Sequence, residues 1–266
     1  MFRKKEWIAF IVAVLVMGFA FGFNDGRDSF VFGEWIVNML WSFLMVAVIL
    51  LVYQWSQKTV AKMNGFKTEF SLWSIDTFNW GWWRGFMVKQ QKDLPYTFSF
   101  FGREITIKSF PIGVILSLVV TLVTNGHLFF LGVTHYGLMI KRAKRLGRKF
   151  INVTGYDEAK IAVSGPLSCV VLMVVLGLLN TQGTFTQMII MCTWIALFNM
   201  IPFFQFDGGK IWNGARVIYV FGLVLIVAIS VLVHFLDFMP LLLISVALAI
   251  AAAVIFFIKR HVEVKQ

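Results

Sequence analysis

Long apolar runs separated by short polar segments make up most of this chain. A transmembrane helix needs about 20 apolar residues to cross roughly 30 Å of hydrocarbon. Runs of this kind lie at 7–23, 36–53, 159–180, 186–204, 216–236 and 239–258. The pattern therefore predicts six transmembrane helices.

Polar interruptions predict two further elements. The apolar segment 111–140 is broken at Asn125-Gly126-His127, so each of its arms is too short to span a bilayer alone. Residues 96–108 alternate apolar and polar side chains around Gly102, which is typical of a short β-hairpin. Segment 54–95 has no clear periodicity, and we assign it no fold.

These elements predict an all-α polytopic membrane protein with six transmembrane helices and a broken hairpin at 111–140. We divide the chain into two N-terminal transmembrane helices (1–53), an interfacial segment with the β-hairpin (54–110), a membrane core (111–212), and C-terminal helices with a basic tail (213–266).

The composition agrees with this division. Hydrophobic residues make up 59% of the 266 positions, and the mean hydropathy is +0.81. Values this high are not those of an ordinary soluble domain. The lipid bilayer is therefore an expected partner of the chain.

The distribution of charge predicts the orientation. Lys and Arg gather near the cytoplasmic ends of spans, and here they cluster at 3–5, 58–67, 141–149 and 259–260. All four clusters fall on one side only if segment 111–140 enters and returns, which places both termini in the cytoplasm. We expect the plasma membrane of a prokaryote. Anchoring to anionic lipid accounts for the net charge of +11, so no nucleic-acid partner is required.

Candidate chemistry lies where the predicted span 186–204 ends. Asn199 and Pro202 precede Asp207, Gly208 and Gly209. Proline interrupts the helical hydrogen bonds, glycine permits close backbone approach, and the asparagine amide can pair with a neighbouring backbone. An ionisable residue near such a break is a functional candidate, and the element could hold an extended peptide.

This element resembles the Asn-Pro-x-Pro…Leu-Asp-Gly motif of the site-2 protease family of intramembrane zinc metalloproteases. A second match, Gly165-Pro166, resembles the family's small-residue Gly-Pro element, and the β-hairpin at 96–108 is also similar to that family. The resemblance covers about residues 96–212 and implies a site-2-protease-like core of helices. It also implies that Asp207 corresponds to a zinc ligand.

The family's His-Glu-x-x-His motif, which supplies two zinc ligands and a general base, does not occur in this chain. His135 lies at the expected first histidine, Tyr136 at the expected catalytic glutamate, and Met139 at the second histidine, on what the resemblance predicts to be a helix. A tyrosine with an ordinary pKa near 10 is a poor base at neutral pH, and a thioether suits Cu(I) better than Zn²⁺.

The leading hypothesis is therefore a pseudoprotease that binds a segment of another membrane protein or serves as a subunit of a membrane complex. Asn199, Pro202, Gly208 and Gly209 would form the peptide-binding part. One alternative is a divergent zinc metalloprotease that uses His135 and Asp207 as ligands. A further alternative is a small-solute or ion carrier built on the broken hairpin and Asp207.

Overall fold

The computed structural model describes residues 3–24, 26–27, 30–74, 96–100, 103–107, 111–140, 153–180, 183–203, 206–232 and 238–263. Within these ranges the chain is mostly helical. The helices are α1 (Lys4–Gly22), α2 (Phe32–Met63), α3 (Ile112–Val123), α4 (Gly155–Leu179), α5 (Thr186–Asn199), α6 (Asp207–Gly214), α7 (Arg216–Leu232) and α8 (Phe238–Glu263). The strands are β1 (Phe66–Leu72), β2 (Tyr96–Phe100), β3 (Arg103–Ile107) and β4 (Thr134–Ile140).

Four of the described helices are long and apolar enough to cross a membrane, judged by length and composition. They are α1, α2, α4 and the part of α8 from Pro240 to Ile258. The other two predicted spans correspond to α5 and α7, of 14 and 17 residues. At 1.5 Å per residue α5 is about 21 Å long, which is shorter than the hydrocarbon core of a bilayer.

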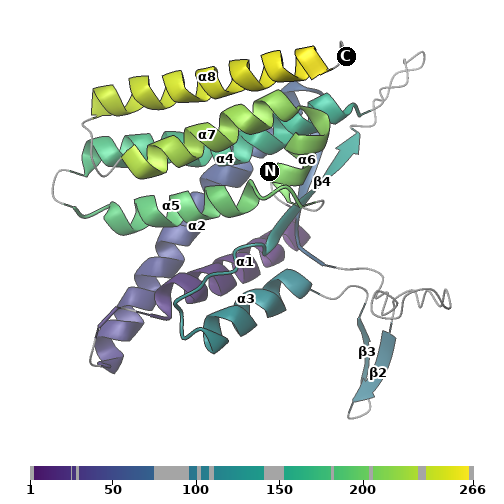
Figure 1. Cartoon of the computed structure of the whole chain (residues 1–266). Helices are drawn as coiled ribbons and strands as arrows, with labels where there is room; N and C mark the ends of the chain where they lie inside the picture. The colour runs from purple at the N-terminus through teal and green to yellow at the C-terminus, as the bar shows by residue number, and fades with distance from the viewer. Residues whose placement is uncertain are drawn as a thin grey trace.

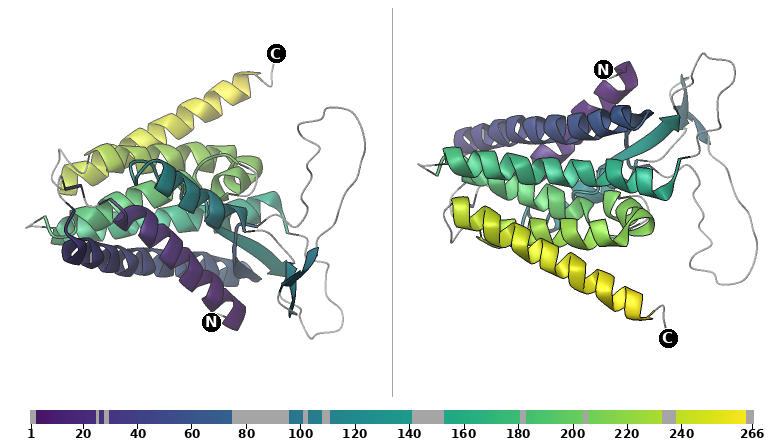
Figure 2. Two further views of the ribbon diagram at one scale, coloured as in Figure 1. Left: turned by 90° about the horizontal axis from the view of Figure 1, so that it is seen from below. Right: turned by 90° about the horizontal axis from the view of Figure 1, so that it is seen from above.

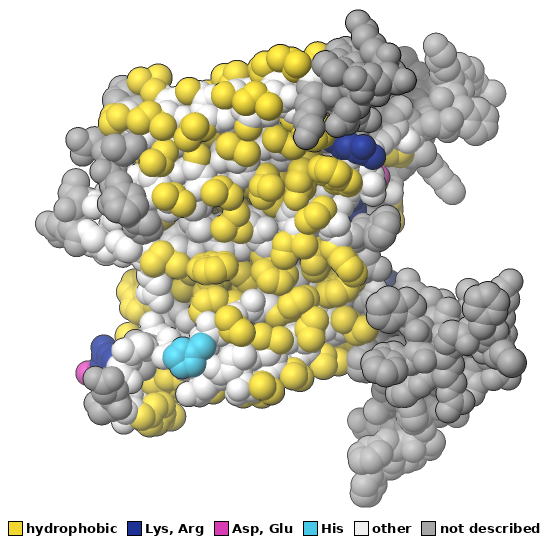
Figure 3. All heavy atoms as spheres, in the orientation of Figure 1, with side chains coloured by type: hydrophobic (Ala, Val, Ile, Leu, Met, Phe, Trp, Pro, Cys, Tyr) yellow, Lys and Arg dark blue, Asp and Glu magenta, His cyan; other side chains and the backbone are white. Residues whose placement is uncertain are grey.

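The helices pack around a central α4, which contacts α2, α5, α6 and α7, while α8 packs on α7 and α1 on α2 (Figure 1). Apolar side chains cover the surface of the helices seen in Figure 3. On α8, Leu243 is 71% exposed and Ile255 is 65% exposed. A helix with its apolar side chains turned outward is compatible with an integral membrane protein, because lipid rather than water can cover it.

The described turns that connect the helices lie at two opposite ends of the helices (Figure 2). At one end, the loop after α1 meets the turn after α3, where the Asn24 side chain donates to the Asn125 carbonyl at 3.4 Å. At the other end, which we call the basic end, Arg3, Lys58 and Lys67 lie near strand β1. Segment 111–140 therefore turns back after α3, and β4 ends at the basic end, where Ile140 pairs with Phe66. The side of the membrane on which this end lies stays a prediction. The densest basic cluster, at 141–149, lies outside the described residues.

Strands β1 and β4 form an antiparallel two-stranded sheet at the basic end, with Phe66 opposite Ile140 and Leu72 opposite Thr134. The described chain is mostly helical, as predicted, but the second arm of 111–140 ends in strand β4 and is not helical. Asn125 and Gly126 adopt φ values of +50° and +74°, which reverse the chain after α3.

The β-hairpin predicted at 96–108 is confirmed. Strands β2 and β3 pair in antiparallel register, with Phe100 opposite Arg103. Figure 1 shows this hairpin away from the helices, on the side of the basic end.

Candidate functional site

Asp207 is the first residue of α6 and lies buried between α2, α4 and the end of α5, with 6% of its surface exposed. Its Oδ2 accepts two hydrogen bonds from α2. The Tyr53 hydroxyl donates at 2.5 Å, and Nε2 of Gln57 donates at 2.7 Å. Tyr53 and Gln57 are four residues apart, so a single helix face presents both donors to the carboxylate. Two neutral donors thus hold one carboxylate oxygen in a buried position.

Gly165 and Gly208 allow the helices around Asp207 to approach closely. A Cβ atom added at Gly165 would lie 2.4 Å from the Tyr53 ring, and one added at Gly208 would lie 2.3 Å from the Met200 carbonyl oxygen. These distances are far below ordinary van der Waals contact. Both sequence motifs therefore lie around the same buried carboxylate. Gly165 lets α4 approach Tyr53 on α2, and Gly208 lets α6 approach the end of α5.

The residues expected to bind a peptide have different surroundings. Asn199 is 3% exposed, and its side-chain amide donates to the Ile195 carbonyl one turn earlier at 2.9 Å. Gly208 and Gly209 are buried in the first turn of α6 rather than in an open turn. Pro202 is exposed in the connection between α5 and α6. Of the four residues, Pro202 is the one that the structure leaves at the surface.

Lys210 and Tyr136 lie beside the carboxylate. The ammonium group of Lys210 donates to the Tyr136 carbonyl at 2.7 Å and lies 3.4 Å from the centroid of the Tyr136 ring. The Tyr136 hydroxyl donates to the Glu158 carbonyl at 3.4 Å. Burial raises the pKa of Tyr136 well above its ordinary value, so this residue keeps its proton.

Burial also dominates the electrostatics of Asp207. It raises the pKa of the carboxyl to about 6, although the charge of Lys210 and the hydrogen bonds from Tyr53 and Gln57 all lower it. Burial lowers the pKa of Lys210, and the negative charge of Asp207 opposes that change. The site therefore holds a carboxyl group with a pKa of about 6. Its neighbours are two neutral hydrogen-bond donors and one partly buried cation, Lys210.

His135 and Tyr136 are neighbours in strand β4, so their Cβ atoms project to opposite faces of the sheet, although the two ring centroids lie 6.4 Å apart. Tyr136 is 2% exposed and faces α6 through Lys210. His135 is half-buried and pairs across the sheet with Ser71, on the other face. The predicted helix at this position is therefore wrong, and with it the helical spacing of His135, Tyr136 and Met139. In the strand, Tyr136 rather than His135 is directed toward Asp207.

The described residues do not fit the zinc site that the resemblance implies. A zinc ion needs several ligands that converge at about 2 Å. Asp207 is already bound by Tyr53 and Gln57 and has Lys210 one turn away, and a cation disfavours a second cation. Within the part of the chain that the structure describes, no group of three or more His, Cys, Asp or Glu side chains is placed to hold a metal ion.

An aromatic cluster lies next to this site, formed by Trp73, Phe130, Phe198, Phe203 and Phe206. The Trp73 ring lies 5.2 Å from Phe206, 6.0 Å from Phe130 and 6.4 Å from Phe203, measured between centroids. Phe130 lies 5.0 Å from Phe198. Phe203 is 53% exposed, so the cluster reaches the surface beside Pro202. Trp73 is 9% exposed, and its Nε1–H has no hydrogen-bond partner among the described residues.

Sequence reasoning missed four residues that the structure brings to this region: Tyr53, Gln57, Lys210 and Trp73. The signal for the first two was present, because Tyr53 and Gln57 are polar groups on one face of a helix that begins as an apolar span. The other two depend on the β1–β4 pairing and on the position of α6, and neither is visible locally in the sequence.

No protein-family model, curated protein or solved structure matches this chain. The resemblance to the site-2 proteases therefore rests on the sequence motifs, and it stays a prediction.

Proposed function

We propose that this protein binds a transmembrane or juxtamembrane segment of another membrane protein at the aromatic cluster, without hydrolysing it. The observation that carries this proposal is the buried indole N–H of Trp73, which has no hydrogen-bond partner among the described residues and lies in a cluster that reaches the surface at Phe203. A buried donor without an acceptor is unfavourable, and a bound chain can supply the acceptor.

The cluster also defines the chemistry of the partner. Exposed apolar side chains at Ile201 and Phe203 favour an apolar segment. In a regular helix each carbonyl is already hydrogen-bonded, except in the last turn. The acceptor for Trp73 is therefore a carbonyl at a helix end or in an unwound stretch of the partner.

The state of Asp207 supports binding rather than hydrolysis. Its hydrogen bonds with Tyr53 and Gln57 give it a structural role in joining α2 to α6. The position at which the resemblance places a general base is Tyr136, which remains protonated. As part of the proposal, the protein is a pseudoprotease-like member of a membrane complex, with the basic end and both termini in the cytoplasm.

Photo-crosslinking in membranes tests the proposal. A photoreactive phenylalanine analogue replaces Phe203 in one variant and Ile255 in a control variant; both positions are apolar and exposed, and Ile255 lies on α8. We expect a discrete adduct at position 203 that is absent at position 255. Adding Trp73→Phe, which keeps an aromatic ring and removes the N–H, should lower the yield at position 203.

Two results would contradict the proposal. Equal labelling at both positions would show only general contact with neighbouring membrane proteins. A yield at position 203 that Trp73→Phe leaves unchanged would show that the indole donor takes no part in binding.

A further inference from the structure

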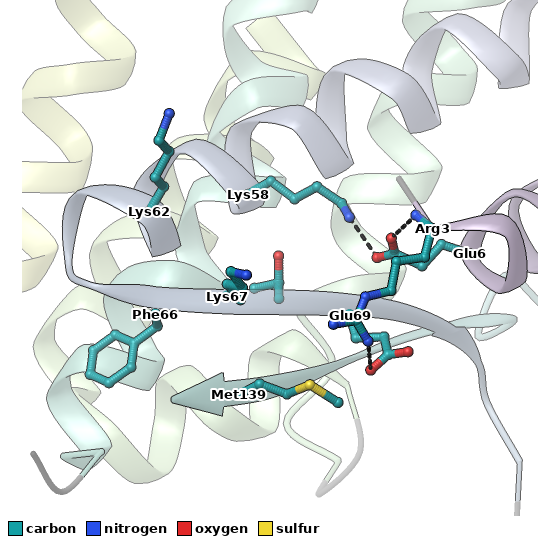
Figure 4. A pocket seen from close by; sticks show the side chains of 9 residues that line it. Arg3, Glu6, Lys58, Lys62, Phe66, Lys67, Glu69 and Met139 are labelled. Carbon is teal, nitrogen blue, oxygen red and sulfur yellow. Dashed lines mark hydrogen bonds and ion pairs between the residues drawn. The ribbon is translucent and has the colours of Figure 1, made fainter. Parts of the chain in front are cut away.

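A separate cavity of about 350 Å³ lies at the basic end, between the start of α1, the last turns of α2 and strand β1 (Figure 4). In Figure 4, Lys58 extends from α2 toward Glu6, while Lys67 stands on β1 and Met139 on β4. The volume of the cavity falls within the range of about 300–1,000 Å³ that is usual for small-molecule sites. The cavity shares no lining residue with the Asp207 site or the aromatic cluster.

The cavity has an excess of positive charge. Four basic and two acidic side chains line it. The carboxylate of Glu6 is 2.5 Å from the Lys58 ammonium, and Arg3 lies 3.8 Å from Glu69. These two ion pairs account for both acids, and they include neither Lys62 nor Lys67. Within the described part of the chain, the charges of Lys62 and Lys67 are therefore left to attract an anion.

Thr68 supplies a buried hydrogen-bonding group in the same cavity. This residue is 9% exposed, and its Oγ1 has no partner among the described residues. The backbone of Thr68 also faces away from β4. The Phe70 N–H donates to Glu6 at 2.9 Å rather than to β4. Backbone N–H groups two residues apart in a strand point in the same direction, so the Thr68 N–H also points away from β4. The hydroxyl and the N–H of Thr68 can therefore both serve a ligand.

We propose that this cavity binds a phosphate group, either that of an anionic phospholipid or free phosphate. Lysine ammonium groups, a hydroxyl and a backbone N–H are the donors that phosphate oxygens accept. The cavity lies where α1 begins and α2 ends, and both helices are candidate spans. The ends of spans lie at the level of the lipid headgroups, where anionic phosphates are concentrated. This inference does not depend on the proposed function.

Binding to the full-length protein in detergent tests the site. The ligands are phosphatidylglycerol, phosphatidylcholine and inorganic phosphate, the last used alone and as a competitor. We expect saturable binding of phosphatidylglycerol that K62Q/K67Q weakens by about 25-fold, since each lysine near anionic lipid contributes about 1 kcal/mol. The control K4Q/K5Q removes the same charge at the start of α1, outside the cavity, and should change affinity by less than about threefold.

Thr68→Val keeps the side-chain shape and removes the unpaired hydroxyl. It should weaken binding about tenfold without lowering the unfolding temperature of the ligand-free protein. Competition by inorganic phosphate at equal affinity would assign the site to free phosphate. Binding that inorganic phosphate does not displace would assign it to the lipid. An equal loss of affinity in K62Q/K67Q and K4Q/K5Q would overturn the proposal, as would the absence of saturable binding of any of the ligands.

Discussion

Asp207→Asn tests whether the buried carboxyl group is more stable in its neutral form. The pKa of Asp207 is about 6 in the folded protein and 3.8 without the fold. A difference of this size makes ionisation cost the folded state about 3 kcal/mol relative to the unfolded state. Because the folded pKa is raised, the group's full stability is present below pH 3.8 and is lost as the pH rises through 6.

Asparagine keeps the acceptor for Tyr53 and Gln57 but cannot ionise, so it should remove this pH dependence. The assay is thermal unfolding in detergent from pH 4.5 to 7.5. Over that range we expect the wild type to lose about 2 kcal/mol relative to Asp207→Asn, which corresponds to roughly 4–8 °C. The exposed carboxylate of Glu34 provides a control, since Glu34→Gln should follow the wild type. The reasoning would be refuted if the difference in unfolding temperature between the wild type and Asp207→Asn did not change with pH. It would also be refuted if Asp207→Asn were less stable than the wild type at every pH.

Three further experiments, two of them with a matched control substitution, test the packing around the carboxyl group by thermal unfolding. Tyr53→Phe removes the donated hydrogen bond and should cost about 1.5–3 kcal/mol, and an unchanged unfolding temperature would contradict the assigned bond. Gly165→Ala places a methyl group against the Tyr53 ring and should cost roughly 1–3 kcal/mol, whereas Gly33→Ala, with open space around its Cβ, should be neutral or stabilising. Tyr136→Ala should cost about 3–5 kcal/mol and His135→Ala about 1 kcal/mol or less; the reverse order would mean that the strand register is wrong.

The sequence was sufficient for features that hydropathy or local alternation determines. The apolar runs located the positions of α1, α2, α4, α5, α7 and α8, although α2 continues for ten residues beyond the predicted end at 53. Alternation around Gly102 predicted the β2–β3 hairpin, in which the two strands are adjacent in sequence.

The β1–β4 sheet was missed because its partners are far apart in the sequence. Residues 66–72 alternate apolar and polar side chains, so a strand signal was present at β1. The residues of β4, however, continue an apolar segment that reads equally well as part of a helix. Register with β1 decides which face His135 and Tyr136 occupy, and no local pattern contains that information. The family resemblance pointed to a helix here, and the strand replaces it.

For the candidate site, the sequence located the carboxylate and the glycines but not the groups that bind the carboxylate. Asp207, Gly165 and Gly208 were all selected from motifs, and the structure places them around one buried group. The hydrogen-bond donors come from α2, about 150 residues earlier in the chain. The resemblance implied that Asp207 is a zinc ligand, whereas its hydrogen bonds with Tyr53 and Gln57 indicate a structural role.

The most direct test of the central claim, that Asp207 joins α2 to α6 and does not bind zinc, is the zinc content of the purified protein after expression with added zinc. Elemental analysis of the wild type and Asp207→Ala, at known protein concentration, gives zinc per chain. We predict a value far below one, equal in the two proteins. Close to one zinc ion per wild-type chain, lost in Asp207→Ala, would contradict the claim and favour a divergent metalloprotease.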